Sequence, residues 1–180
     1  QKTKRRKKSK RPKTTSVEEA PKRYGAQITT DHIIANSERS RGFTGERRAL
    51  VVDDKHSDYF DSFPLLTKSG GDALAALKDF LGPFVKTEYV YSDNSKELIW
   101  AVAQLKATHG TSTPGVSETN GKIESIVRRV AEGTRVSLLS AGLPPCCWPW
   151  ASRYFSHAAN TQMKDGDSSW NRRHKKGHFE

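Results

Sequence analysis

The sequence predicts a single folded domain of the layered α/β class, and three observations support this. The 180 residues suit one domain with flanking tails. Three short runs rich in Ile, Val and Phe come first, and the following segments alternate helical with strand patterns, as in an α/β layered domain. No apolar run approaches the roughly 18 residues that a membrane-spanning helix needs. We therefore expect no membrane partner.

The first 24 residues are predicted to be a disordered basic arm and linker. Residues 1–13 hold nine Lys or Arg and no acid, so the net charge of +11 falls to +2 without them. Such a block stays solvated and suits a polyanion, nucleic acid above all, or acts as a nuclear localisation signal. A purely solubilising tail is the alternative. The arm residues expected to bind nucleic acid are Lys4, Arg5, Arg6, Lys7 and Lys8.

The first strand is expected at residues 27–35, where Ile and Thr predominate. Asp31 lies in its middle, a costly place for a charge unless a partner or metal meets it. Further strands are expected at 49–52 and 59–66, joined by a polar hairpin turn at 53–58. The aspartates of that turn could suggest a metal site, but Asp is a common turn residue and favours the turn.

The next segments have helical spacing and clear ends. Ser69 is a candidate cap for a helix that Gly82-Pro83 stops, and a strand is expected at 86–91 with Asp93 just beyond it. Asn94 or Ser95 caps the next helix, and the remaining elements follow in order. We expect a short strand at 107–109, a loop at 111–119, a helix to about 140 and a last helix at 148–163.

These elements give a core domain at 25–163, followed by a basic tail or linker at 164–180. That tail is expected to be loop, with Arg172, Arg173, Lys175 and Lys176 as a second basic cluster. The aromatic residues of the last helix are expected to be core rather than a surface for base stacking. They are Trp148, Trp150, Tyr154 and Phe155.

The helix that starts after the loop has a distinct buried face. At about 100° per residue, one apolar arc holds Ile123, Ile126, Val127, Val130 and Thr134. Glu124, Arg128 and Arg135 share a flank of that arc, and Lys122 lies on its other side. A solvated flank with a Glu124–Arg128 pair is one interpretation. The other is that Glu124 meets acids of the strands while the three basic residues contact DNA phosphates.

Several segments together carry a family resemblance. They are Ile28-Thr29-Thr30-Asp31-His32-Ile33, Leu50-Val51-Val52-Asp53-Asp54, Tyr91-Ser92-Asp93-Asn94, His109-Gly110-Thr111-Ser112-Thr113-Pro114-Gly115, Thr119-Asn120-Gly121-Lys122-Ile123-Glu124, and Leu143-Pro144 before Trp148. Residues 26–162 resemble the catalytic core of retroviral and retrotransposon integrases, copia-type above all. Ser95 and Ser125 stand where that family usually has Gly and Arg. The resemblance implies a ribonuclease H-like fold, with a mixed five-stranded sheet, an antiparallel hairpin and flanking helices.

The resemblance also implies a chemistry. Asp31, Asp93 and Glu124 would be the catalytic residues and would bind two Mg²⁺ or Mn²⁺ ions, with Asp31 bridging both. The reaction would be 3′-end processing and strand transfer, that is, DNA integration. The implied partners are element-end and target DNA and further copies of the chain, with RNA as another candidate polyanion. From the basic N-terminal run we expect the protein in the nucleus, or in the cytoplasm as part of a polyprotein or particle.

Three alternatives remain open at this point. Glu118 competes with Glu124 for the third acid, but its place in the expected loop fits the family spacing less well. A protein with the same core and basic arm could bind nucleic acid without catalysis. A ribonuclease H-like nuclease could use the same three acids to cleave RNA.

Overall fold

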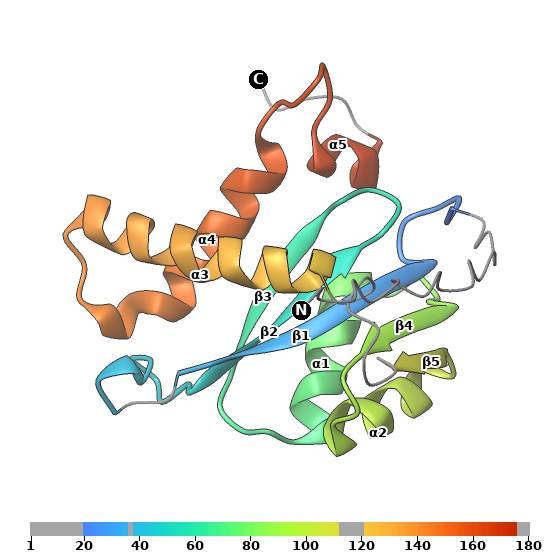
Figure 1. Ribbon diagram of the computed structural model, residues 1–180, viewed down its shortest axis with the longest axis horizontal. Helices are drawn as coiled ribbons and strands as arrows, with labels where there is room; N and C mark the ends of the chain where they lie inside the picture. The colour runs from blue at the N-terminus through green and yellow to red at the C-terminus, as the bar shows by residue number, and fades with distance from the viewer. Residues whose placement is uncertain (1–19, 36–37, 112–120, 176–180) are drawn as a thin grey trace, which may run out of the picture.

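A computed structural model of the chain describes residues 20–35, 38–111 and 121–175. Its centre is a five-stranded mixed sheet of order β3-β2-β1-β4-β5 (Figure 1). The strands are β1 (Gln27–Ile34), β2 (Arg48–Asp54), β3 (Phe60–Leu65), β4 (Tyr89–Ser92) and β5 (Thr108–Thr111). β1, β2 and β3 pair antiparallel, whereas β4 pairs parallel with both β1 and β5. The α/β class, the mixed sheet and the hairpin are therefore confirmed.

Helices cover both faces of the sheet (Figure 1). The helices α1 (Gly70–Leu81) and α2 (Lys96–Leu105) pack on one face, and α3 (Gly121–Ala141) and α4 (Trp148–Thr161) on the other. Two short 3₁₀ helices, η1 (Glu38–Ser40) and η2 (Pro145–Cys147), lie near each other, and α5 (Ser169–His174) is the last element. None of the described helices is both long enough and apolar enough to cross a bilayer.

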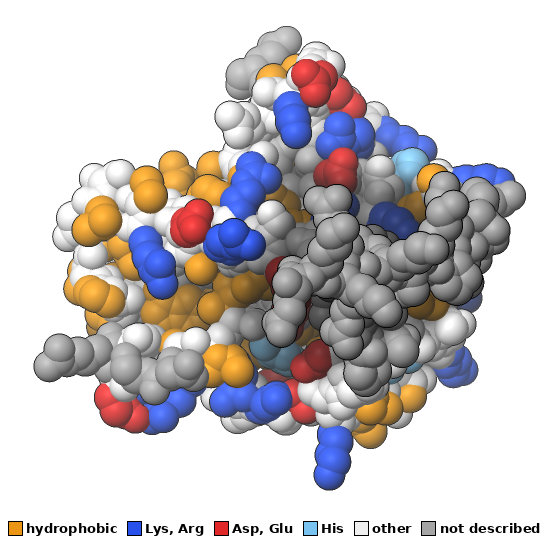
Figure 2. Space-filling view, in the orientation of Figure 1, with side chains coloured by type: hydrophobic (Ala, Val, Ile, Leu, Met, Phe, Trp, Pro, Cys, Tyr) orange, Lys and Arg blue, Asp and Glu red, His pale blue; other side chains and the backbone are white. Residues whose placement is uncertain are grey.

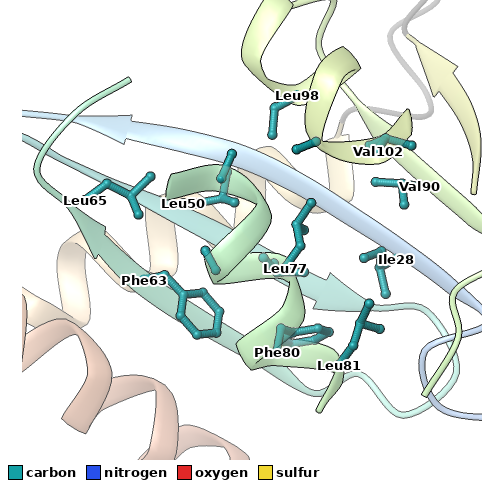
Figure 3. Close-up of a cluster of buried hydrophobic side chains, with 14 of the residues drawn as sticks. Ile28, Leu50, Phe63, Leu65, Leu77, Phe80, Leu81, Val90, Leu98 and Val102 are labelled. Atoms are coloured by element: carbon teal, nitrogen blue, oxygen red, sulfur yellow. The ribbon is translucent and has the colours of Figure 1, made fainter. Parts of the chain in front are cut away.

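The larger core lies between the sheet and α1 and α2 (Figure 3). Alternate residues of β1 and β2 face it, since successive side chains of a strand point to opposite faces. Its central side chains are fully or almost fully buried: Ile28, Leu50, Leu77, Phe80, Leu98 and Val102. As expected, α1 begins after Ser69, whose hydroxyl accepts a hydrogen bond from the Asp72 amide, and ends at Gly82.

The second core lies under α3, and it confirms the expected phase of that helix. Ile123 and Val130 of α3 pack on Val51 and Phe60 of the sheet. Thr134 is also buried, and its hydroxyl donates back to the Val130 carbonyl. The residues placed on the flank are exposed: Glu124, Arg128 and Arg135.

The expected hairpin turn is too long, because β2 continues to Asp54. Asp54 pairs with Ile28, and Asp53 pairs with Thr29. Both aspartates are buried, with 0% and 1% of their surface exposed. The two carboxylates point to opposite faces, and only Asp54 behaves as a turn residue. Its carboxylate accepts hydrogen bonds from the amides of Gly25 and Ser57.

The segment expected to be a C-terminal loop is partly helical and packs on the core. In α5, Arg173 lies over the rings of Tyr24 and Tyr59, 4.7 and 4.3 Å from the ring centres. Its guanidinium also donates to the Phe80 carbonyl over 2.9 Å. The neighbouring Arg172 donates to the Ser57 carbonyl. Two residues of the expected basic cluster therefore join the tail to the domain.

The last helix also differs from expectation. Phe155 packs against the core under α3. Trp150 and Tyr154, however, are 57% and 65% exposed. The expectation that both belong to the core is wrong, because they lie on the face of α4 that is turned away from the sheet. Trp150 instead meets the exposed ring of Phe43, with 5.9 Å between the ring centres.

Candidate carboxylate site

The first two predicted acids come from two adjacent parallel strands, Asp31 from within β1 and Asp93 from just beyond β4. β1 pairs with β4 as far as Thr29 opposite Tyr91, and Asp31 and Asp93 each come two residues later, near enough for the charge of Asp93 to act on Asp31. Asp31 is half-buried in β1, whereas Asp93 is exposed just after β4 ends. Each carboxylate has one oxygen held by backbone. The His32 amide donates to Asp31 over 2.7 Å, and the Ser95 amide donates to Asp93 over 3.2 Å.

The third predicted acid comes from the opposite layer. Glu124 is exposed in the first turn of α3, directly after Ile123, which is buried against the sheet. The α3 helix crosses the same face of β1 and β2 that carries Asp31, since Asp31 pairs with Val51 and Val51 packs under α3. Packing of the apolar face of α3 therefore holds Glu124 over the sheet face that carries Asp31, near enough for its charge to act on Asp31.

The pKa of Asp31 responds to the charges of both other carboxyl groups. Burial raises the pKa of Asp31, and the negative charges of Asp93 and Glu124 raise it further. The His32 amide and the His32 ring oppose that rise. Carboxylates that repel one another in this way are stabilised by a cation between them. The structure thus brings the three predicted acids into one electrostatic field.

Their chemistry fits a hard divalent ion, because Mg²⁺ and Mn²⁺ prefer carboxylate oxygens. The carboxylates, however, are not arranged as a complete metal site. Within the described residues, no group of three or more His, Cys, Asp or Glu side chains stands close enough to hold one metal ion. The charges of Asp93 and Glu124 act on Asp31, but the three side chains do not surround one ion position. Their catalytic and metal-binding roles therefore stay a prediction.

Two histidines beside these acids were not singled out from the sequence. His32 follows Asp31, and its Nε2 is buried and makes no hydrogen bond within the described part of the chain. Burial lowers the pKa of His32, against the opposite effect of Glu97 and Asp93. The Nε2 of His109 lies 2.7 Å from the Ser92 hydroxyl. The direct adjacency of His32 to Asp31 was the one available sequence signal.

Lys122, which is exposed in the first turn of α3, pairs with two aspartates of the β2–β3 hairpin, of which only Asp53 is buried. The Lys122 ammonium lies 3.0 Å from the Asp53 carboxylate and 2.8 Å from that of Asp58. Burial raises the pKa of Asp53 to about 6, although Lys122 lowers it. Lys122 was predicted to contact DNA phosphates, but here its charge is shared by two aspartates. Lys122 therefore links the first turn of α3 to the β2–β3 hairpin through these two ion pairs.

The other predicted nucleic-acid contacts divide into two groups. Arg128 and Arg135 are exposed on α3, where phosphates can reach them. The basic arm residues Lys4, Arg5, Arg6, Lys7 and Lys8 lie outside the described residues. So does most of the expected loop at 111–119, which includes the alternative acid Glu118.

Comparison with known proteins assigns no family to this arrangement. No protein-family model matches the chain, and no curated protein sequence matches it.

Proposed function

We propose that the chain is an integrase-type polynucleotidyl transferase that processes and joins DNA ends through Asp31, Asp93 and Glu124. The observation that supports this most is the shared field of the three carboxyl groups, since Asp93 and Glu124 both raise the pKa of Asp31. The sheet order, with β1 between the antiparallel β2 and the parallel β4, is compatible with a ribonuclease H-like fold. The fold and the acids thus support one reaction class.

In this proposal the residues of the chain have distinct tasks. Asp31, Asp93 and Glu124 would hold two Mg²⁺ or Mn²⁺ ions, which would supply charge stabilisation for an in-line phosphoryl transfer. The His32 and Ser95 amides keep the Asp31 and Asp93 carboxylates oriented, as their hydrogen bonds indicate. Lys122 fixes the first turn of α3 and so the position of Glu124. The exposed Arg128 and Arg135 would bind phosphates of the DNA, independently of its sequence.

The direct test is DNA joining by the Asp93→Asn variant. Asparagine keeps the size of the side chain and can still accept the Ser95 amide, but it loses the charge. We expect Mg²⁺-dependent cleavage and joining of DNA ends by the unaltered chain, and a loss of more than about 100-fold in the variant. The matched control is Asp79→Asn, which removes an exposed acid of α1 whose carboxylate lies 3.5 Å from Arg153.

The alternatives make different predictions in the same assay. A non-catalytic nucleic-acid-binding protein would bind DNA equally well with and without the Asp93→Asn substitution, and would join nothing in Mg²⁺ or Mn²⁺. The exposed Arg128 and Arg135 and the absence of a metal-ready cluster among the described residues favour this second candidate. Cleavage of RNA in a hybrid, without joining, would instead indicate a ribonuclease H-like nuclease.

A further inference from the structure

Two consecutive hydrogen bonds lead from His109 in β5 to the backbone of Asp93. The Nε2 of His109 lies 2.7 Å from the Ser92 hydroxyl, and this hydroxyl donates to the Asp93 carbonyl over 2.9 Å. Ser92 is only 1% exposed, so both hydrogen bonds are sheltered from water. Figure 2 shows acidic side chains and a His side chain near the centre of the view, below α3. His109 is therefore connected to a predicted metal ligand through Ser92.

The strand register brings His109 to Ser92. β4 and β5 pair parallel, with Val90 opposite His109 and Ser92 opposite Thr111. Val90 belongs to the core under α1 and α2, and side chains two residues apart on a strand point to the same face. Ser92 and His109 therefore both lie on the face of the sheet that α1 and α2 cover. The contact between them is a result of the sheet pairing.

The hydroxyl of Ser92 determines the direction of both hydrogen bonds. A serine hydroxyl carries a single hydrogen, and here it is donated to the Asp93 carbonyl. The Ser92 oxygen can then only accept from His109, so the Nε2 of His109 carries a hydrogen. Burial lowers the pKa of His109, against the opposite effect of Asp93. The lowered pKa favours a neutral ring, with its one hydrogen on Nε2.

Asp93 is held at two points by these contacts and by the start of α2. Its carbonyl accepts from Ser92, and its carboxylate accepts from the Ser95 amide over 3.2 Å. Both contacts act where the chain leaves β4, at the position that sets the direction of the Asp93 side chain. Removing the hydrogen-bond partners that orient a metal ligand typically costs about 10–100-fold in metal affinity or activity.

We propose that His109 is a positioning residue for Asp93 and acts through the Ser92 hydroxyl. The proposal rests on the proposed function, because it takes Asp93 as a metal ligand. The role needs only a neutral N–H donor at the place of Nε2. The amide of glutamine supplies such a donor, whereas the amide of asparagine stands at the place of Nδ1 and is too short to reach Ser92.

The first test is nitrogen NMR of the histidine rings in the full chain, which reports the ring nitrogen that carries the hydrogen. We expect the Nε2–H form for His109. The shift of this nitrogen should change in Ser92→Ala, because the hydrogen bond to the hydroxyl is lost. This measurement needs neither metal nor DNA.

The second test is titration of the full chain with Mn²⁺, followed by the relaxation rate of water protons. His109→Asn should weaken Mn²⁺ binding about tenfold, and His109→Gln should stay within about threefold of the unaltered chain. The matched control is His157→Asn, at an exposed position of α4, which should leave the affinity unchanged.

Ser92→Ala shows whether His109 acts through the hydroxyl. This variant should also weaken Mn²⁺ binding about tenfold, and adding His109→Asn to it should lower the affinity no further. Because alanine fits the space of serine, Ser92→Ala remains informative if His109→Asn folds poorly.

Distinct results would overturn the proposal. They are an Nδ1–H ring at His109, equal affinity of His109→Asn and the unaltered chain, equal losses in His109→Asn and His109→Gln, or additive losses in the double variant. Failure of the proposed function looks different. The unaltered chain would then bind no Mn²⁺ while the Nε2–H form of His109 persisted, and the positioning role would fall with the metal site.

Discussion

The two aspartates of β1 and β2 that face α3 have opposite electrostatic surroundings. Asp31 lies in the field of Asp93 and Glu124, and Asp53 lies next to Lys122. Burial raises the pKa of both. Asp53 therefore has a cationic partner, whereas the groups that act most on Asp31 besides His32 are the acids Asp93 and Glu124.

The pKa of Asp53 leads to a prediction about stability. Its pKa rises from 3.8 to about 6 on folding, so the folded protein holds this proton more tightly than the unfolded chain does. The stabilisation is complete below about pH 4 and is lost as the pH rises through about 6. We expect the free energy of unfolding to fall by about 3 kcal/mol over this range because of Asp53.

Urea denaturation between pH 4 and pH 8 measures this effect, with Asp53→Asn as the comparison. The variant cannot titrate at this position, so its stability should vary less with pH by the amount attributed to Asp53. Parallel pH profiles for the two proteins would show that Asp53 has an ordinary pKa in the folded state.

The sequence was informative about Asp31 but not about Asp53. Asp31 interrupts an apolar strand, which is unusual enough to be noticed. Asp53 stands next to Asp54 at the start of a polar run, where Asp is a normal turn residue. Only the pairing of Asp53 with Thr29 and the position of Lys122, 69 residues later, show that it is buried and paired. No local pattern contains that information.

At the scale of elements, helix α3 was predictable because its apolar period is continuous over five turns. The helix α5 was not, because it has six residues and no apolar stripe, and it is held by contacts of Arg173 with distant aromatic rings. The strand ends were also displaced, at Asp54 in β2 and at Tyr89 in β4. Strand ends depend on the partner strand more than on the local sequence.

The contact between α3 and α4 depends on Gly133. A Cβ atom at this position would lie 2.2 to 2.4 Å from three atoms of the Phe155 ring. Gly133→Ala should therefore lower the free energy of unfolding by about 1–3 kcal/mol, despite the higher helix propensity of alanine. Thermal or urea denaturation provides the measurement.

Gly121→Ala is the control for this prediction, because a Cβ atom there would meet none of the described residues within 4 Å. It should leave stability unchanged or raise it by up to about 1 kcal/mol. If Gly133→Ala stabilised the protein as well, α3 and α4 would not pack closely at Gly133 and Phe155.

At the scale of the whole molecule, residues distant in sequence close the domain. Arg173 covers Tyr24, Tyr59 and Phe80, which come from the N-terminal segment, the end of the hairpin and α1. Arg173→Ala should destabilise the protein by about 1–3 kcal/mol, through the lost ring contacts and the lost hydrogen bond to Phe80. Arg128→Ala, at an exposed position of α3, should change stability by less than about 0.5 kcal/mol. Equal effects in denaturation would mean that α5 does not pack on the core.

The layered α/β architecture was predictable from the succession of strand and helix patterns. The order of the strands was not, because it rests on pairings such as Ile28 with Val90 that no local pattern specifies. The same holds for the candidate site. The three acids could be named from the sequence, but their common field arises from the β1–β4 pairing and from the packing of α3.

Anomalous diffraction from crystals soaked in Mn²⁺ would test whether Asp31, Asp93 and Glu124 form the proposed site for divalent ions. We expect at least one manganese peak at about 2 Å from carboxylate oxygens of both Asp31 and Asp93, absent in crystals of the Asp93→Asn variant. A map from well-ordered crystals with no peak beside these carboxylates, or with manganese only at other acids, would rule out the proposed metal site.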